Sequence, residues 1–259
     1  MRALTIAGLT ALGVSMVHAG PICQVQSGTT MAALVELYTS EGCSSCPPAD
    51  NTLRAIRRSA GPSAVVIPLA LHVSYWDQIG WKDQFAQKTF DVRQTKLVAA
   101  SGGRVVYTPQ YFVNGRELRD WQASLPATIG KVNSHPAGAA ITLKSTAETP
   151  GTLLLEAVAD ARVTSGRQAL FVAVSESALV SHVTRGENSG ATLRHDDTVR
   201  ALIGPIALIN GRASLRQQVA LAPGWNLQRL HSIAFVQDVD DSSILQAVST
   251  AQCMPSTPS

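Results

Sequence analysis

A pair of cysteines lies where the sequence changes from a predicted strand to a predicted helix, and this junction constrains the fold more than any other feature. Residues 33–39 (ALVELYT) form a short apolar run typical of a buried strand. Cys43 and Cys46 follow, and two prolines come directly after Cys46. Proline is tolerated in the first turn of a helix, where amide hydrogens lack partners. Because leucine and isoleucine recur at helical spacing over residues 49–58, we expect a helix to begin at the second cysteine.

Cys43 and Cys46 have the spacing of a thiol–disulfide exchange site. A thiol must ionise before it attacks a disulfide, and the first turn of a helix stabilises the thiolate. The second cysteine can then attack the mixed disulfide that the first one forms. Zinc sites use the same spacing, but they add a second pair of ligands that this sequence lacks. We therefore expect Cys43 to be the nucleophile, with a lowered pKa and the more accessible thiol, and Cys46 to be the resolving cysteine, with no metal ion or other cofactor.

Residues 1–19 have the layout of a secretory signal. Arg2 supplies a positive start, an apolar stretch covers residues 3–17, and the segment ends in VHA, which fits a cleavage site between small residues. The apolar stretch is too short to span a bilayer comfortably, and no second such stretch follows it. The alternative is a short core helix. We expect a cleaved signal peptide, a periplasmic or secreted protein, and no transmembrane segment after cleavage.

Export changes the interpretation of the four cysteines. In an oxidising compartment an even number of cysteines suggests pairing, and four cysteines allow three pairings. The redox motif accounts for Cys43 and Cys46, which leaves Cys23 and Cys253. We expect these two to form a structural disulfide that joins the ends of the mature chain, since the termini of compact chains often lie close together. The alternative is two free thiols.

The composition describes a globular chain without a strong charge. Hydrophobic residues make up 45% and charged residues 15%, which is typical of a chain with an ample core. The length of 259 residues suits two domains of ordinary size. A net charge of +3 before signal cleavage gives no argument for nucleic acid or an anionic membrane surface as a partner.

The first half of the mature chain alternates strand and helix signals. Residues 64–73 form a second, nearly unbroken apolar run, as expected for a strand covered on both faces. Pro68 within it removes a ladder hydrogen bond and predicts a β-bulge. We expect helices at residues 85–100 and 120–132, and between them a strand that closes in a hairpin at Asn114-Gly115.

The character changes from residue 134 onward. Runs of alternating apolar and polar residues are separated by turn residues, which is typical of antiparallel strands with one solvated face. We therefore expect an α/β domain followed by a mostly antiparallel β-sandwich. The predicted boundaries are a signal peptide at 1–19, the α/β domain at 20–136, the β-sandwich at 137–253 and a flexible tail at 254–259. The expected strands of the sandwich are 139–143, 152–159, 168–175, 204–209 and 230–237.

The α/β half resembles the thioredoxin superfamily. Residues 35–46 (VELYTSEGCSSC) are similar to the first strand and active site of thioredoxin, with one extra residue before the first cysteine. Thr108-Pro109 is similar to the glutaredoxin stretch that contains the cis-proline. The resemblance implies a thioredoxin-like fold, with a cis peptide at Thr108-Pro109 that lies against the cysteines and pairs with an extended substrate. It also implies that Glu36, near the position of the buried acid of thioredoxin, relays a proton to Cys46; the alternative is that Glu36 faces solvent on an edge strand.

Four longer phrases narrow the resemblance. TSEGCSSCPPAD, HVSYWDQIGWKDQFA, GRVVYTPQYFVNG and RGENSGATLRHDDTVR together resemble a family of exported bacterial proteins of unknown function. The resemblance implies a thioredoxin-like first half and a β-rich second half, and it supplies no substrate. This sequence departs from the family pattern at Ser74, where aspartate is expected, and at Pro68.

Polar and aromatic residues outside the cysteine motif give further candidates. His72 ends the second predicted strand and is either functional or a hydrogen-bonded core histidine. In the second half, a metal site is one interpretation of the run His195-Asp196-Asp197, but consecutive residues of a strand point to opposite faces. We favour a structural network between the domains, with Glu187 and Arg194 paired. The aromatic loop after His72 either walls the cysteine site or packs in the core; its candidates are Tyr75, Trp76, Asp77, Trp81 and Asp83.

The sequence thus favours an exported thiol–disulfide oxidoreductase that acts on protein thiols or disulfides, with a membrane redox partner. Two alternatives remain open. In the first, Cys43, Cys46 and a histidine such as His72 hold copper(I). In the second, the chain is a non-catalytic binding module whose cysteine pair stays oxidised. The Ser-Ser dipeptide between the cysteines does not fix the direction of the redox reaction.

Overall fold

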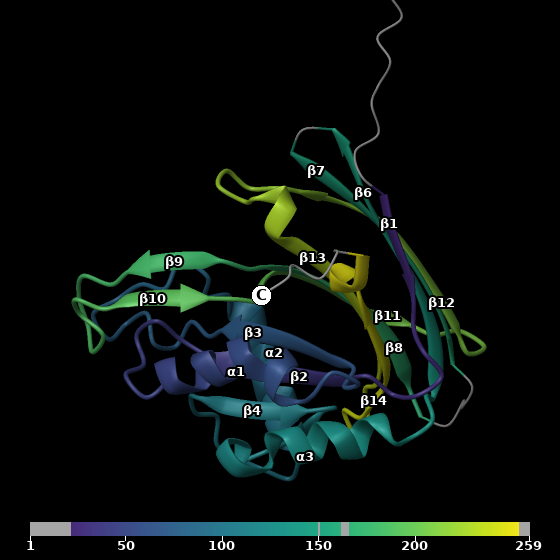
Figure 1. Ribbon diagram of the computed structural model, residues 1–259, viewed down its shortest axis with the longest axis horizontal. Helices are drawn as coiled ribbons and strands as arrows, with labels where there is room; N and C mark the ends of the chain where they lie inside the picture. The colour runs from purple at the N-terminus through teal and green to yellow at the C-terminus, as the bar shows by residue number, and fades with distance from the viewer. Residues whose placement is uncertain (1–21, 150, 162–165, 254–259) are drawn as a thin grey trace, which may run out of the picture.

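The computed structural model describes residues 22–149, 151–161 and 166–253, and these hold three α-helices and fourteen β-strands (Figure 1). The predicted signal peptide and the predicted tail lie outside the described residues. The helices are α1 (Pro47–Ser59), α2 (Lys88–Ala100) and α3 (Trp121–Asn133). The strands are β1 (Ile22–Gln26), β2 (Ala33–Thr39), β3 (Val66–His72), β4 (Gln110–Val113), β5 (Arg116–Glu117), β6 (Ala139–Thr149), β7 (Thr152–Ala161), β8 (Gln168–Glu176), β9 (Leu179–His182), β10 (Thr192–His195), β11 (Thr198–Ala207), β12 (Arg212–Ala220), β13 (Leu230–Asp238) and β14 (Ile244–Ser249).

One eight-stranded sheet runs through both halves of the chain, in the order β14-β13-β8-β11-β3-β2-β4-β5. The two halves meet where β11 lies parallel to β3, with Thr198 opposite Ala70. The amide of Ala70 donates a hydrogen bond to the carbonyl of Asp197 at 2.9 Å. A second sheet has the order β1-β6-β7-β12, and β9 and β10 form a separate two-stranded hairpin.

The expected thioredoxin-like α/β domain followed by a separate β-sandwich is wrong. The structure is mostly β-sheet, with three helices among the described residues. The edge of β3 that a self-contained α/β domain would leave free is occupied by β11 from the second half. In addition, β1 at the start of the described chain pairs with β6 in the second sheet. Each of the two larger sheets therefore contains strands from both halves of the chain.

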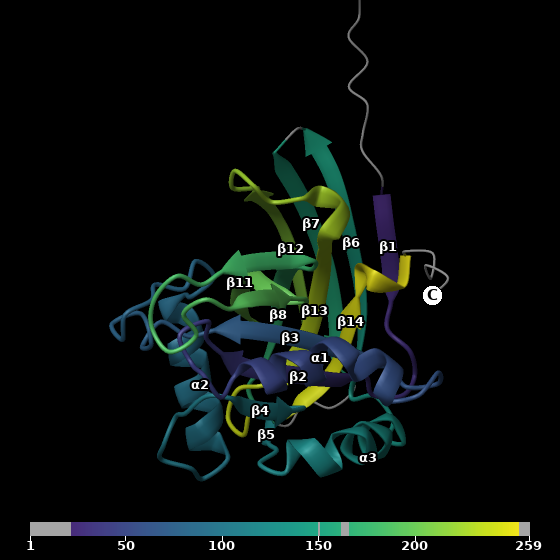
Figure 2. The same ribbon diagram turned by 60° about the vertical axis from the view of Figure 1, so that its left-hand side comes forward.

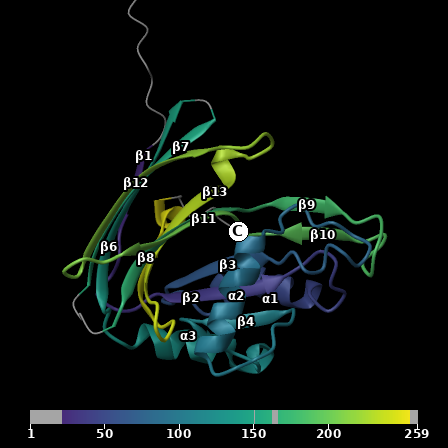
Figure 3. The ribbon, with the colours of Figure 1, turned by 180° about the vertical axis from the view of Figure 1, so that it is seen from behind.

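Alternation along the strands gives the large sheet two apolar faces. On β8, Phe171 and Ala173 belong to one core, and Leu170 and Val172 belong to another. The first core also contains Phe90 and Leu97 of α2, which lies over this face (Figure 3). The opposite face is covered by α1 and α3 over β2 to β4, and by the four-stranded sheet over β8 and β13 (Figure 2). The four-stranded sheet and the second-half strands thus form a sandwich-like arrangement.

Pro68 causes no bulge, contrary to the prediction. Strands β2 and β3 stay in register from Ala33 opposite Val66 to Thr39 opposite His72. The amide of Ala70 points toward β11, so the nitrogen of Pro68, two residues earlier, faces the same side. Strand β11 begins only opposite Ala70, and no ladder bond is lost at Pro68.

A buried ion pair connects β2 to α2 and to the second half of the sheet. Arg93 donates from Nε and Nη2 to the carboxylate of Glu36 at 2.6 and 2.8 Å, and from Nη1 to Gln237 Oε1 at 3.1 Å. Its guanidinium lies 5.3 and 5.0 Å from the ring centroids of Phe171 and Phe235. Burial and the charge of Glu36 together hold the pKa of the neighbouring Tyr38 well above its usual value. One arginine therefore joins the strands of both halves.

We predict that Glu36→Ala lowers the free energy of unfolding by about 3–5 kcal/mol, because it leaves the Arg93 charge buried without its carboxylate. Urea denaturation at neutral pH measures this change. The control is Arg119→Ala, which breaks another arginine–carboxylate pair. Arg119 pairs with Glu117, and the Arg119 side chain is 76% exposed. The control should change the free energy by less than about 1 kcal/mol. Equal effects of the two substitutions would contradict the prediction.

Candidate functional site

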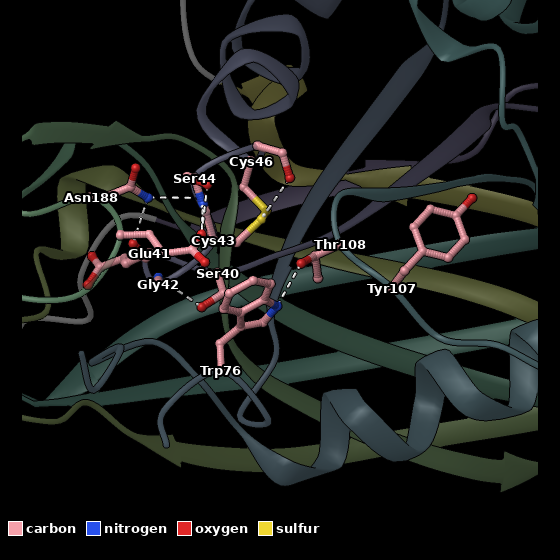
Figure 4. The surroundings of a disulfide bond; sticks show 12 residues. Ser40, Glu41, Gly42, Cys43, Ser44, Cys46, Trp76, Tyr107, Thr108 and Asn188 are labelled. Atoms are coloured by element: carbon pink, nitrogen blue, oxygen red, sulfur yellow. Dashed lines mark hydrogen bonds between the residues drawn. A yellow bond between two sulfur atoms is a disulfide. The ribbon is translucent and has the colours of Figure 1, made fainter. Parts of the chain in front are cut away.

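Cys43 and Cys46 lie at the start of α1, where two turns lead from β2 into the helix. The amide of Cys43 donates to the carbonyl of Ser40, and the amide of Cys46 donates to that of Cys43, both at 3.2 Å. Cys46 is the residue before the helix, and Pro47 begins it. A disulfide joins the two cysteines, whose Cα atoms are 5.4 Å apart (Figure 4). Both cysteines are fully buried, whereas Ser44 and Ser45 between them are exposed.

The loop between β9 and β10 closes over the cysteine pair from the second half of the chain. The amide and the hydroxyl of Ser44 donate to Glu187 Oε2 at 3.0 and 2.7 Å. Asn188 Nδ2 donates to the carbonyls of Glu41 and Cys43, both at 2.9 Å (Figure 4). The bonds from Ser44 hold the pKa of Glu187 below its usual value. These contacts hold the backbone on both sides of Cys43.

The expected Glu187–Arg194 pair is therefore not formed, because Glu187 accepts from Ser44. Asp196 and Asp197, which follow His195 in the same polar segment, do connect the two halves. Asp196 Oδ2 lies 3.2 Å from Arg54 Nε of α1, and Asp197 Oδ1 lies 2.8 Å from Arg57 Nη2. No group of three or more histidine, cysteine, aspartate and glutamate side chains within 22–149, 151–161 and 166–253 is arranged to hold a metal ion.

The aromatic loop after β3 borders the cysteines on the side of the Thr108-Pro109 peptide. That peptide is cis, and Gln110, which follows it, begins β4. Trp76 Nε1 donates to Thr108 Oγ1 at 2.7 Å, and Figure 4 shows the indole nitrogen directed at Thr108. A Cβ atom on Gly42 would lie 3.4 Å from Trp76 Cβ. Trp76 thus bridges the residue before Cys43 and the loop before β4.

A buried group of ionisable side chains lies at the residues that precede the cysteines. Asp83 Oδ2 accepts from the amide of Glu41 at 2.9 Å and lies 2.6 Å from His72 Nδ1. Glu41 Oε1 lies 3.2 Å from His195 Nε2, and Glu41 Oε2 accepts from Trp81 Nε1 at 2.7 Å. Each of the four ionisable residues is at most 3% exposed. His72 is thus a core histidine within a polar network, and Trp81 belongs to the same network.

The pKa values in this network follow from the pairing of opposite charges. Burial disfavours the imidazolium of His72, but the adjacent carboxylate of Asp83 outweighs it and raises the pKa of His72. Burial acts to raise the pKa of Asp83, but the charge and hydrogen bond of His72 dominate and lower it. The pair is therefore held as imidazolium and carboxylate.

Glu36 and the Cys23–Cys253 pair, for which the sequence also predicts roles, both lie away from this site. Glu36 faces α2, whereas Val35 and Leu37 beside it pack in the core of α1 on the other face of the sheet. It neither faces solvent nor lies with the cysteines. Cys23 and Cys253 are joined by a disulfide, with Cα atoms 6.0 Å apart and a separation of 230 positions in the sequence.

The sequence of the chain matches one known protein family. Residues 34–237 match a family described as "Protein of unknown function (DUF1223)". The chain belongs to this family. No curated protein matches it. Within the described part of this DUF1223 member, no helix is long and apolar enough to cross a membrane.

Two solved structures resemble this DUF1223 chain. One is protein AGR_C_4864 from Agrobacterium tumefaciens, with 22% identity, 86% of this chain and 95% of that chain covered, and a TM-score of 0.57. The other is HBP35 of Porphyromonas gingivalis, with 17% identity, coverage of 86% and 76%, and a TM-score of 0.66. At these identities the likeness extends to the fold alone.

Sequence reasoning missed three residues at this site. Glu187 and Asn188 lie in the singled-out run RGENSG, but their contact with the cysteine loop depends on long-range pairing that no local pattern reports. Asp50 follows Cys46 by four residues, which is one helical turn, and that spacing was a usable signal. Asp50 lines a hollow of about 180 Å³ together with Pro47, Asn51, Arg54, Thr192, Leu193 and Arg194.

We predict that Glu187→Ala speeds reduction of the Cys43–Cys46 disulfide by dithiothreitol several-fold, because the loop over Cys43 loses its bonds to Ser44. Glu187→Gln keeps an acceptor oxygen and should fall between the variant and the natural protein. The control is Glu156→Ala, which removes a partly exposed carboxylate on β7 that pairs with Lys144 and not with the cysteine loop. Stopped-flow detection of the released thiols measures the rates. An unchanged rate for Glu187→Ala would show that this loop does not limit access.

Proposed function

We propose that this protein is an exported thiol–disulfide oxidoreductase in which Cys43 is the nucleophile and Cys46 the resolving cysteine. The observation that carries the proposal is a disulfide between residues three apart, formed directly before the first turn of α1. A free thiolate at Cys43 is favoured there by the helix dipole. The Ser45 hydroxyl, 3.3 Å from Cys43 Sγ, can donate to the same thiolate.

The reaction balances without a cofactor. A substrate thiolate attacks Cys43 Sγ, the Cys43–Cys46 bond breaks, and its electron pair goes to Cys46 Sγ. A second substrate thiolate attacks the substrate sulfur of the mixed disulfide and releases Cys43 as a thiolate. The substrate dithiol loses the two electrons that the cysteine pair gains, and the reverse sequence reduces a substrate disulfide. The proposed substrates are protein thiols or disulfides outside the cytoplasm, and a membrane redox partner would exchange electrons with the cysteine pair.

The burial of both cysteines favours one rival, a purely structural disulfide. The exposed Ser44-Ser45 segment and its bonds to Glu187 support the proposal instead, because the part of the chain next to Cys43 reaches the surface and is held there by a loop of the second half. The two functions differ in how easily the disulfide is reduced.

We predict a reduction potential for the Cys43–Cys46 couple of about −120 to −270 mV, the span of known dithiol oxidoreductases, whereas structural disulfides fall below about −300 mV. Equilibration with glutathione buffers, followed by alkylation and peptide mapping, measures it. The Cys23–Cys253 disulfide in the same sample is the internal control. Turnover with a reduced, unfolded protein substrate should be lost in Cys43→Ser and in Cys46→Ser. A Cys43–Cys46 couple as resistant as Cys23–Cys253 would establish the structural rival.

A further inference from the structure

The hollow of about 180 Å³ lies between α1 and β10, where the two halves of the chain meet (Figure 1). Helix α1 contributes Asn51 and Arg54 to its wall, and β10 contributes Thr192 and Arg194. Pro47, which directly follows the second cysteine, also lines it. The volume is enough for several water molecules, and therefore for a carboxylate with one or two methylene groups. A group bound there would lie beside the cysteine motif.

One of the two arginines in the wall carries a positive charge without a partner. Arg54 Nε lies 3.2 Å from Asp196 Oδ2, and Arg54 Nη1 donates to Asn51 Oδ1, also at 3.2 Å. Arg194 is exposed, and it makes no hydrogen bond, ion pair or ring contact with any residue that the structure describes. Its guanidinium is a planar set of donors that matches the geometry of a carboxylate. Arg194 is thus free to bind an anionic ligand.

The carboxyl group in the wall opposes an anion less than an ordinary aspartate would. Burial raises the pKa of Asp50, and the charges of His72 and His195 counter this effect only in part. The raised pKa means that the negative charge of Asp50 is disfavoured. The hollow therefore presents the charge of Arg194 with little to cancel it.

The first turn of α1 contributes a positive potential but no free amide hydrogen. Its two prolines carry none, and the amides of Ala49 and Asp50 both donate to the carbonyl of Cys46, at 2.9 and 3.0 Å. A ligand in the hollow must therefore be held by side chains. The donors for it are the guanidinium of Arg194 and the amide group of Asn51, whose oxygen already accepts from α1.

We propose that this hollow binds a carboxylate of the substrate, so that the protein selects thiols or disulfides with an aspartate or glutamate near the reacting cysteine. The inference rests on the proposed function and names the class of substrate for it. Ser44 and Ser45 are exposed beside Cys43, and Pro47 in the wall follows within the same turn of the chain. An extended segment covers at most about 3.3–3.6 Å per residue, so an acidic residue close to the substrate cysteine is the one that can reach the hollow.

The test compares two peptides with blocked ends and a single cysteine, which differ only in a glutamate or a glutamine beside that cysteine. Quenched-flow and mass spectrometry measure how fast each peptide forms a mixed disulfide with the natural protein and with Arg194→Gln. The ratio of the glutamate rate to the glutamine rate should be about threefold or more higher in the natural protein, since one partly exposed ion pair is lost in the variant. The reactivity of the peptides themselves is the same with both proteins and cancels in this comparison.

Two controls separate the hollow from general effects of charge. Arg58→Gln removes an exposed arginine of α1 that does not line the hollow, and it should leave the ratio unchanged. The uncharged reductant dithiothreitol should open the disulfide at the same rate in all three proteins. In the natural protein, about 1 M NaCl should lower the ratio to that of Arg194→Gln, because it screens charges beyond about 3 Å.

A second measurement detects binding without any redox step. The same peptides with serine in place of cysteine are titrated while nitrogen-15 NMR follows the Nε–H signal of Arg194. The glutamate peptide should give a saturable shift and the glutamine peptide none. Sodium acetate at the same concentration is the probe for a free small anion. If acetate shifts the signal as strongly as the glutamate peptide, the assignment to a substrate segment is overturned.

The outcomes separate this inference from the proposed function. If the glutamate peptide binds at Arg194 but protein thiols are not oxidised, the oxidoreductase function fails and the carboxylate site stands. If the protein turns over its substrates and Arg194→Gln leaves the ratio of rates unchanged, the carboxylate site is overturned and the function stands.

Discussion

The structure depends on the parallel contact between β3 and β11, because it is there that two halves of the chain become one sheet. The backbone contact is short, with Thr198 opposite Ala70 and one bond from the Ala70 amide to Asp197. Side chains on either side reinforce it. Arg54 and Arg57 of α1 pair with the two aspartates before β11, and Gln87 Nε2 donates to the carbonyl of Arg200 at 3.0 Å. The arginines therefore tie the helix that carries the cysteines to the strand that joins the halves.

The candidate site is a consequence of that joint. Strand β11 follows β10 directly, so fixing β11 against β3 brings the β9–β10 hairpin over the start of α1. The hairpin then supplies Glu187 and Asn188 to the backbone around Cys43, and His195 to Glu41. Neither half has a complete site alone, since the cysteines come from the first half and their cover from the second. We therefore expect that a weaker contact between β3 and β11 would also weaken the hold of the β9–β10 hairpin on the backbone around Cys43.

Local signals in the sequence predicted the elements well and their assembly poorly. The helix after the cysteines and the strand at residues 33–39 agree with α1 and β2, because periodicity and proline placement are local properties. The hairpin at Asn114-Gly115 also agrees. Gly115 has a positive φ of 80°, and a Cβ atom there would overlap the carbonyl oxygen of Ser242, so this turn requires glycine. The joint between β3 and β11 left no local trace, because a parallel pair brings together residues more than a hundred positions apart. The predicted two-domain fold failed at that joint.

The position of Glu36 shows how a small displacement in sequence changes the chemistry of a site. Side chains alternate across a strand, so a shift by one residue moves a group to the opposite face. Glu36 lies on the face of α2, where Arg93 neutralises it. Its neighbours Val35 and Leu37 fill the face of α1 with apolar groups. On that face an acid from β2 would have no partner, so the carboxylates near the cysteines come from other elements, with Glu41 in the loop and Asp50 on the helix.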